Sequence, residues 1–544
     1  MSEHDQEKAL AKRRQWEEHN RAKALAKQQE KDTVDQITLP PVPRQRQFQA
    51  IRGTRDLLPP ETALWNHVEE TAQRVFGTFG FGEIRVPIFE PTELFARSIG
   101  ENTDVVGKEM YTFVDRYEKL DPSPTMGQLG DYLEKVKRSY EAEEIPKTPF
   151  NKIAIEEAQI VWNRVGPWLA DSPSSEMRND DLDRLIVYLD AMELGSTISL
   201  RPEATASVCR AYIEHSMQQL PQPVKLYYAG PMFRRERPQK GRYRQFYQIG
   251  AEVLGGQDAP AIDAELIEML MAFFDKLELK GIELDINSIG HNAPNCRPAY
   301  VEKLRAALAQ VKDKLGEDSK RRIDTNPLRV LDSKLDFEQH IIATLPKIGD
   351  NLCDECKAHY AAVKTQLELR GVIYKENWRL VRGLDYYMRT TFEITAQGLG
   401  SQNAVCGGGR YDGLVELLGG PPTKGIGFAI GEDRLILSLQ EGNKVQAKQG
   451  RDVYIAWMGE HAYATAVRAA KDLRNAGFSV ELPPTQLKFG KALSHADKLG
   501  AKFALILGEN EVSEGLWTLK TLADGAQTKL PEPAIIEHLR NSLL

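Results

Sequence analysis

Six basic side chains fall within the eleven residues 234–244, where only Glu236 is acidic. The six are Arg234, Arg235, Arg237, Lys240, Arg242 and Arg244. Guanidinium groups donate paired hydrogen bonds, so they bind phosphate groups with defined geometry as well as charge. The segment therefore predicts contact with phosphates, although a solvated basic loop is the common alternative for such a run.

Extended, partly apolar runs flank this basic segment and predict a strand–loop–strand hairpin. Side chains alternate with period two along a strand, so Gln248, Gly250 and Glu252 share one face of the second strand. Such a polar row is costly in a core unless a partner hydrogen-bonds it. We expect a polar ligand to lie over Gly250 and to supply those partners.

A further candidate for phosphate contact, Arg434, falls in the opening turn of a predicted helix. Gly425, Gly427 and Gly431 precede it in the run GIGFAIGEDRLIL. This order would place a guanidinium beside a helix N-terminus, where backbone N–H groups also favour anions. A surface ion pair between Arg434 and Asp433 is the alternative.

The elements that must position these residues follow from the surrounding patterns. Apolar residues at helical intervals predict a helix over 61–79, and FGEIRVPIFEP then predicts a strand that contains Pro87. Proline in a strand indicates an edge or an interface. The segments 109–116 and 196–205 predict the two arms of one hairpin.

Three other segments are predicted to lie outside this framework. Residues 117–195 carry 16 acidic against 9 basic residues and predict an acidic helical insert, whose charge disfavours RNA phosphates. Residues 1–47 predict a charged helical or flexible N-terminal extension. Residues 291–376 are largely helical by pattern.

Cys353 and Cys356 form a CxxC pair within this last segment. A structural zinc site needs four ligands, and the sequence shows no second Cys or His pair at a suitable spacing. We therefore expect no dedicated metal site held by the protein itself.

The C-terminal segment 451–544 alternates strand, helix, strand, helix and strand. This alternation predicts a compact α/β domain with a mostly parallel sheet.

The whole chain has 544 residues, of which 41% are hydrophobic and 27% charged, and this predicts a soluble protein of roughly three or four domains. The net charge is −7, so any contact with nucleic acid must come from local basic patches. We find no apolar run of the ~20 residues that a membrane span needs, and no apolar signal segment. Five cysteines fit a reducing, cytoplasmic compartment.

Several of these runs resemble the class II aminoacyl-tRNA synthetases. Their motif 1 is similar to FGEIRVPIFEP, their motif 2 to RRERPQKGRYRQF and their motif 3 to GIGFAIGEDRLIL. Two further runs resemble the histidyl-tRNA synthetases in particular, namely LVRGLDYY (380–387) and CGGGRYDGL (406–414). The resemblance implies an α/β fold whose α+β catalytic core, 48–116 and 196–437, has an antiparallel sheet flanked by helices. It also implies helical insertions, including an insertion domain at 291–376, and a C-terminal anticodon-binding domain at 451–544.

The resemblance also implies roles for individual residues. The implied catalytic arginines are Arg234, Arg382 and Arg434, with Glu236 and Arg242 completing the ATP site. The implied histidine-binding residues are Glu203, Thr205, Arg234, Gln248, Glu252, Arg382, Tyr386, Tyr387 and Tyr411. Gln239 and Arg244 match loop positions that contact the tRNA acceptor end.

The function that the resemblance implies is ligation of L-histidine to tRNA(His), with ATP and Mg²⁺, by a homodimer that uses no membrane. The alternative is a catalytically inactive paralogue that senses histidine or tRNA, or regulates histidine biosynthesis. Such paralogues tend to lose motif arginines or the C-terminal domain, whereas this chain keeps Arg234, Arg382 and Arg434.

Overall fold

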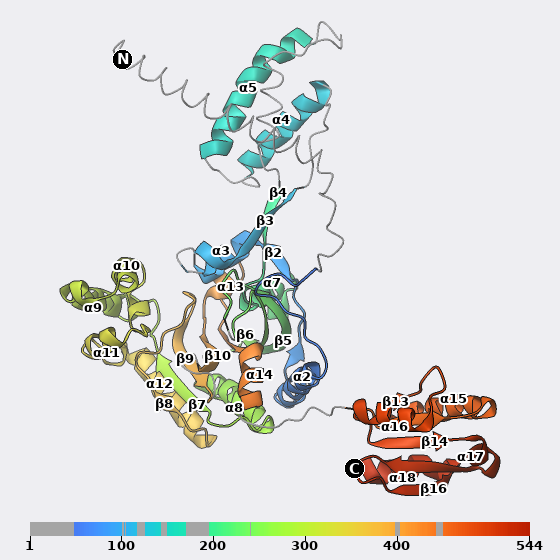
Figure 1. The fold of residues 1–544 in the computed structure, drawn as a ribbon. Coiled ribbons are helices and arrows are strands. Elements are labelled where there is room, and N and C mark those ends of the chain that lie inside the picture. Colours follow the sequence, from blue (N-terminus) through green and yellow to red (C-terminus); the bar gives the residue numbers. More distant parts are fainter. Residues whose placement is uncertain are drawn as a thin grey trace, which may run out of the picture. The chain divides into compact units, whose positions relative to one another are not determined.

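The computed structural model describes residues 48–100, 103, 105–116, 126–142, 149–169, 195–239, 241–397, 403–441 and 450–543. The chain divides into two compact units (Figure 1). The larger unit comprises the described residues of Met1–Asp56 and Thr71–Gly442, and the C-terminal unit comprises those of Leu57–Glu70 and Asn443–Leu544. The predicted extension at 1–47 lies outside the described residues.

An eight-stranded sheet forms the centre of the larger unit. Its order is β1 (Gly82–Glu83), β5 (Val224–Phe233), β6 (Gln245–Leu254), β11 (Gly425–Gly431), β10 (Ala404–Arg410), β9 (Met388–Thr395), β7 (Glu283–Ser288) and β8 (Lys375–Glu376). The six strands from β5 to β7 pair antiparallel, and only the short edge strands β1 and β8 pair parallel. The predicted antiparallel sheet is confirmed.

Helices flank this sheet (Figure 1). They are α3 (Thr92–Ile99), α7 (Thr205–Glu214), α8 (Pro260–Lys276), α13 (Leu414–Leu417), α14 (Glu432–Glu441) and the part of α2 (Glu61–Thr78) that begins at Thr71. Phe76 of α2 contacts the rings of Tyr227, Phe273 and Phe428, with centroids 5.5–5.8 Å apart. Aromatic rings from two helices and two strands thus close one face of the sheet.

The hairpin predicted around the basic segment is confirmed by the pairing of β5 with β6. Tyr228 lies opposite Gly250 in this register. A Cβ at Gly250 would meet the Tyr228 ring at 2.3 Å, so that ring, rather than a ligand, covers the glycine. Our expectation of a ligand over Gly250 is therefore wrong, because the cross-strand neighbour fills the space that the missing side chain leaves.

The strand predicted to contain Pro87 is divided in two. β1 ends at Glu83, and β2 spans Phe89–Pro91 in a second, three-stranded sheet of order β2-β4-β3. Proline lacks the N–H that a ladder needs, so the chain changes from one sheet to the other around Pro87. In the second sheet, β3 (Tyr111–Arg116) pairs antiparallel with β4 (Gly195–Leu200), which confirms the predicted hairpin arms.

The described part of 117–195 contains two helices, α4 (Met126–Glu141) and α5 (Pro149–Leu169). They pack at Gly130, where a Cβ would meet the Trp162 ring at 2.5 Å. The segment 291–376 is helical as predicted, with α9 (Arg297–Gln310), α10 (Glu317–Thr325), α11 (Asp336–Ala343) and α12 (Asp354–Leu369). Buried Tyr300, Leu304 and Leu308 of α9 join these helices to the main core.

The C-terminal unit has a five-stranded sheet of order β13 (Val480–Glu481), β12 (Val453–Trp457), β14 (Phe503–Leu507), β15 (Leu516–Thr521) and β16 (Gln527–Pro531). Its helices are α15 (Glu460–Asn475), α16 (Phe489–Lys498), α17 (Glu509–Glu514) and α18 (Glu532–Leu543). β15 pairs antiparallel with both β14 and β16, so the prediction of a mostly parallel sheet is wrong for the part of the sheet that β15 and β16 form. A short turn after β15 makes a hairpin that the strand–helix alternation did not indicate.

Within the described residues, every helix is too short or too polar to span a bilayer.

Candidate active site

A cavity of about 790 Å³ opens in the larger unit. It brings together residues more than two hundred positions apart, and ten of the predicted site residues line it. These are Glu203, Thr205, Arg234, Glu236, Arg242, Gln248, Arg382, Tyr386, Tyr387 and Arg434. The three arginines predicted to contact phosphate therefore share one cavity with the predicted amino-acid pocket.

The basic wall of the cavity is built around Glu236. Arg242 Nη1 donates to Glu236 Oε2 at 3.0 Å, and Arg234 Nη1 lies 4.0 Å from Glu236 Oε1. Arg434 Nη1 donates to the carbonyl of Ala404 at 3.0 Å. Burial lowers the pKa of Arg434, and the charges of Arg242 and Arg234 add to that effect. One carboxylate among three guanidinium groups leaves a positive wall that an anionic ligand would stabilise.

Asp433 does not form the ion pair with Arg434 that was the alternative for this motif. Its Oδ1 accepts from Arg55 Nη2 at 3.1 Å, and its Oδ2 accepts from the backbone N–H of Tyr247 at 3.0 Å. Asp433 thus ties the start of α14 to strand β6 and to the segment before α2.

Arg382 lies against the glycines of β10. A Cβ at Gly407 would lie 1.7 Å from Arg382 Nη2, so only glycine permits this approach. Nη1 donates to Glu393 Oε2 at 2.8 Å, and the buried Nε has no hydrogen-bond partner among the described residues. Sequence reasoning missed Glu393, which is opposite Gly407 in the β9–β10 register. Only that register connects the two positions.

Glu203 and Thr205 form the start of α7. The Glu203 carboxylate accepts from the backbone N–H groups of Thr205 at 2.7 Å and Ala206 at 3.0 Å. Burial raises the pKa of Glu203, whereas those two bonds and the charge of Arg234 lower it. Glu203 therefore caps the helix as well as lining the cavity.

Glu252 and Tyr411 lie behind the cavity rather than on its wall. Tyr411 donates to Glu252 Oε2 at 2.6 Å, and Thr205 donates to Glu252 Oε1 at 2.7 Å. Tyr386, whose ring is 4.7 Å from Tyr387 and 5.8 Å from Tyr411, connects this layer with the cavity. Burial raises the pKa of Glu252 to about 8.

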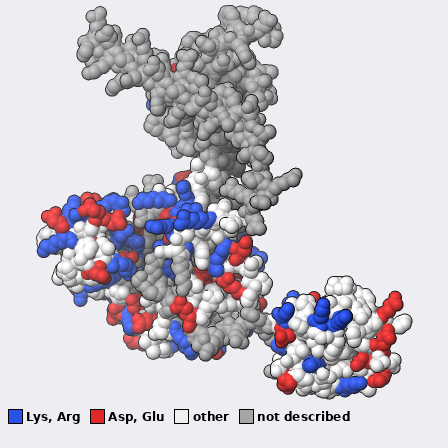
Figure 2. Space-filling view, in the orientation of Figure 1, with Lys and Arg blue, Asp and Glu red and all other residues white. Residues whose placement is uncertain are grey.

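The predicted tRNA residues also lie off the cavity wall. Gln239 bridges to Arg242 through backbone hydrogen bonds, and the N–H of Arg244 donates to the carbonyl of Gly53. The helical segment 291–376, here called the helical domain, supplies three further arginines to the cavity wall. They are Arg321, Arg322 and Arg329. Figure 2 shows Lys and Arg side chains gathered over and beside this domain.

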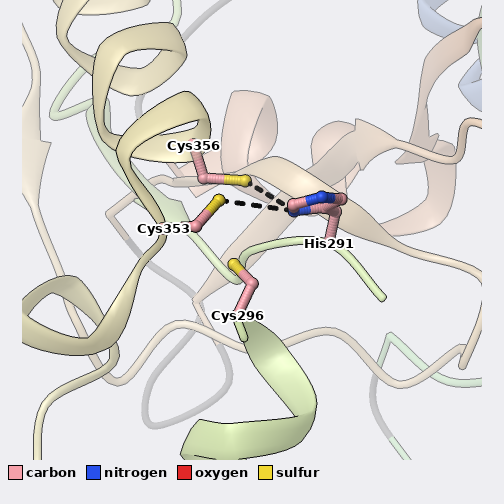
Figure 3. Close-up of side chains that lie close together, drawn as sticks. All are labelled: His291, Cys296, Cys353 and Cys356. Carbon is pink, nitrogen blue, oxygen red and sulfur yellow. Dashed lines mark hydrogen bonds between the residues drawn. The ribbon is translucent and has the colours of Figure 1, made fainter. Parts of the chain in front are cut away.

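The structure overturns the basis on which we expected no metal site. Two residues, His291 and Cys296, lie beside Cys353 and Cys356, although no spacing in the sequence predicts this. The four side-chain atoms that could bind a metal are within 4.8 Å of one another (Figure 3). The first pair is distant in sequence from the CxxC pair, so only the fold reveals the set.

Comparison with known proteins gives consistent matches. The family Histidyl-tRNA synthetase matches residues 169–435, and the family Anticodon binding domain matches 452–542. The histidine–tRNA ligase of Koribacter versatilis (strain Ellin345) is 46% identical over 498 residues, 91% of this chain and 96% of that protein. That of Solibacter usitatus (strain Ellin6076) is 44% identical over 90% of this chain and 99% of that protein. A crystal structure of apo S. aureus histidyl-tRNA synthetase has a TM-score of 0.64 and 32% identity, covering 91% of this chain and 100% of that one.

Proposed function

Because the chain belongs to the histidyl-tRNA synthetase family and is a histidine–tRNA ligase, we propose that its 790 Å³ cavity performs the activation of histidine. In this reaction the histidine carboxylate attacks the α-phosphate of ATP, histidyl-adenylate forms and pyrophosphate leaves. The observation that carries the assignment is the convergence of Arg234, Arg382 and Arg434 on one cavity with Tyr386 and Tyr387.

The three arginines would stabilise the negative charge that gathers on the phosphate oxygens. Arg382 reaches the cavity from the side of β10 and Arg234 from the hairpin, so an α-phosphate between them would be held from two directions. Arg434, with Arg242 and Glu236, would bind the rest of the nucleotide, which enters as ATP with its Mg²⁺.

The opposite part of the cavity would bind histidine. Glu203 and Thr205 supply oxygen atoms for the α-ammonium group, and Gln248 supplies an amide for the backbone end. Tyr387, on the wall, would meet the imidazole. Glu252 and Tyr411, one layer deeper, would set the polarity of the pocket floor through their 2.6 Å hydrogen bond. A paired polar site of this kind rejects amino acids that leave its groups unpaired.

We further propose transfer of histidine to tRNA(His), with Gln239 and Arg244 at the acceptor end and the C-terminal unit at the anticodon. The basic side chains of the helical domain would meet the RNA backbone, because phosphate contacts supply most of the affinity of such complexes.

We also propose a homodimer in the cytoplasm. Ile88 and Phe89, at the edge of the three-stranded sheet, are 44% and 56% exposed, and Phe113 is 47% exposed. Phe89 belongs to β2 and Phe113 to β3, the two outer strands of this sheet. Exposed apolar side chains on so small a sheet indicate a surface that a second copy covers. Sedimentation velocity of the full chain should show a dimer, and a monomer at micromolar concentration would contradict this proposal.

The activation step is tested by ATP–pyrophosphate exchange with each of the twenty amino acids and no tRNA. We expect exchange with histidine alone. Folded protein that binds histidine yet supports no exchange would instead indicate the sensory or regulatory alternative.

A further inference from the structure

We propose that His291, Cys296, Cys353 and Cys356 bind one structural Zn²⁺ ion, which joins the helical domain to the central sheet. Three thiols and one imidazole are a ligand set that structural zinc sites use. None of the four residues lines the cavity assigned to histidine and ATP, so the site is separate from catalysis.

The geometry of the four ligand atoms suits a tetrahedral ion. His291 Nδ1 lies 3.0 Å from Cys356 Sγ and 3.8 Å from Cys353 Sγ, and all four atoms lie within 4.8 Å of one another. Zinc–ligand bonds of about 2.0–2.3 Å place tetrahedral ligands about 3.5–3.8 Å apart. Small side-chain rotations would therefore seat an ion among them. Figure 3 shows the three sulfur atoms and the imidazole directed toward one common point.

Two of the three cysteines occupy helix N-termini, where backbone N–H groups without helical partners can donate to sulfur. Cys296 is the N-cap of α9, and Cys353 is the N-cap of α12, with Cys356 in the first turn of that helix. Two helix N-termini thus direct their positive ends at the cluster, and this placement stabilises negative sulfur.

The second nitrogen of His291 faces a carboxylate. Its Nε2 lies 3.9 Å from Glu355 Oε2, and Glu355 also pairs with Arg389. This separation is longer than a hydrogen bond, so Glu355 places a negative charge behind the imidazole without fixing its tautomer. The arrangement leaves Nδ1 on the side of the sulfur atoms, as the proposed site requires.

Burial argues for a closed structural site. Cys296 and Cys356 are fully buried, whereas His291 and Cys353 are only partly covered. The four ligands come from the loop after β7 and from the starts of α9 and α12, which are separate segments of the chain. An ion among them would connect these segments where Arg389 also donates its N–H to the carbonyl of Gly290.

The metal content of the full chain tests the proposal without reference to activity. Protein purified in reducing buffer without chelator should carry about one zinc per chain after desalting, measured by inductively coupled plasma mass spectrometry. Cys296→Ser and Cys356→Ser should each lower this content at least tenfold. Cys209→Ala is the matched control, because Cys209 is a buried thiol outside the cluster, and it should retain the zinc.

Cobalt substitution provides a second measurement that does not depend on the folding of a variant. Wild-type protein freed of zinc and given Co²⁺ should show the visible bands of tetrahedral cobalt and a near-ultraviolet thiolate band, both lost on addition of Zn²⁺. Folded, reduced protein that holds less than about a tenth of an equivalent of zinc and gives no such spectrum would overturn the proposal. A disulfide within the cluster, with no metal uptake after its reduction, would also overturn it.

Discussion

Replacing Gly407 with alanine tests whether the close approach of Arg382 to β10 makes the site competent for histidine activation. A Cβ at position 407 would lie 1.7 Å from Nη2 of Arg382 and 2.3 Å from its Cζ. Ordinary van der Waals contact begins at 3.4 Å, so the guanidinium must retreat from 1.7 to 3.4 Å or turn away. Its ion pair with Glu393, which now has a length of 2.8 Å, would be strained or lost.

The displacement sets the size of the expected effect. Misplacing a catalytic group by about 1 Å costs about 10²-fold in rate. We therefore expect Gly407→Ala to lower kcat/KM for histidine-dependent ATP–pyrophosphate exchange by ~10²-fold, which is ~2.7 kcal/mol of transition-state stabilisation. Histidine binding, measured by calorimetry, should persist, because the three atoms nearest to the added Cβ all belong to the arginine that we place at the α-phosphate.

Two comparisons make this prediction specific. Arg382→Ala should lose at least as much exchange activity, and the double variant should fall no further, because both changes remove the same interaction. Gly77→Ala is the control, since Gly77 lies in α2 and a Cβ added there would have no atom within 4 Å, and it should keep wild-type activity. The reasoning fails if folded Gly407→Ala keeps exchange within ~3-fold of wild type, or if the double variant shows the product of the two losses.

Gln239→Ala should lower aminoacylation far more than adenylate formation, and equal losses in both half-reactions would remove Gln239 from the acceptor site. Burial raises the pKa of Glu252 to about 8, so the folded state holds a proton that an unfolded chain releases above about 4.5. The free energy of unfolding should therefore fall as pH rises from about 4.5 to 8, by on the order of a few kcal/mol. Glu252→Gln should remove this part of the pH dependence in urea unfolding. An unchanged pH dependence in the variant would contradict the raised pKa of Glu252. Asp263 is fully buried and lies 2.6 Å from Arg410, which also pairs with Asp412 at 3.1 Å and Asp258 at 3.4 Å. Asp263→Asn should lower the free energy of unfolding by ~3–5 kcal/mol, because the buried Arg410 would lose the nearest of its three carboxylates. A loss below ~1 kcal/mol would show that Asp412 and Asp258 compensate.

The sequence by itself identified the residues that carry the chemistry, because each lies in a short run with a recognisable local order. These runs identify Arg234 in the hairpin, Arg382 in LVRGLDYY and Arg434 at the start of α14. All three arginines line one cavity. The strands and helices around them were predictable for the same reason, since period-two and helical patterns are properties of neighbouring residues.

Tertiary structure alone decided which distant residues meet. Glu393 pairs with Arg382 only because β9 and β10 adopt a register that places it opposite Gly407. Tyr228 covers Gly250 for a similar reason, where local pattern suggested a ligand.

The cluster of His291 and Cys296 with Cys353 and Cys356 depends most completely on the fold. Neither pair predicts the other from spacing, because more than fifty residues of helical domain separate them. Their ligand atoms meet only because the fold brings the starts of α9 and α12 beside the loop after β7. Local sequence patterns report what one segment does, whereas such a site is a property of how folded segments pack.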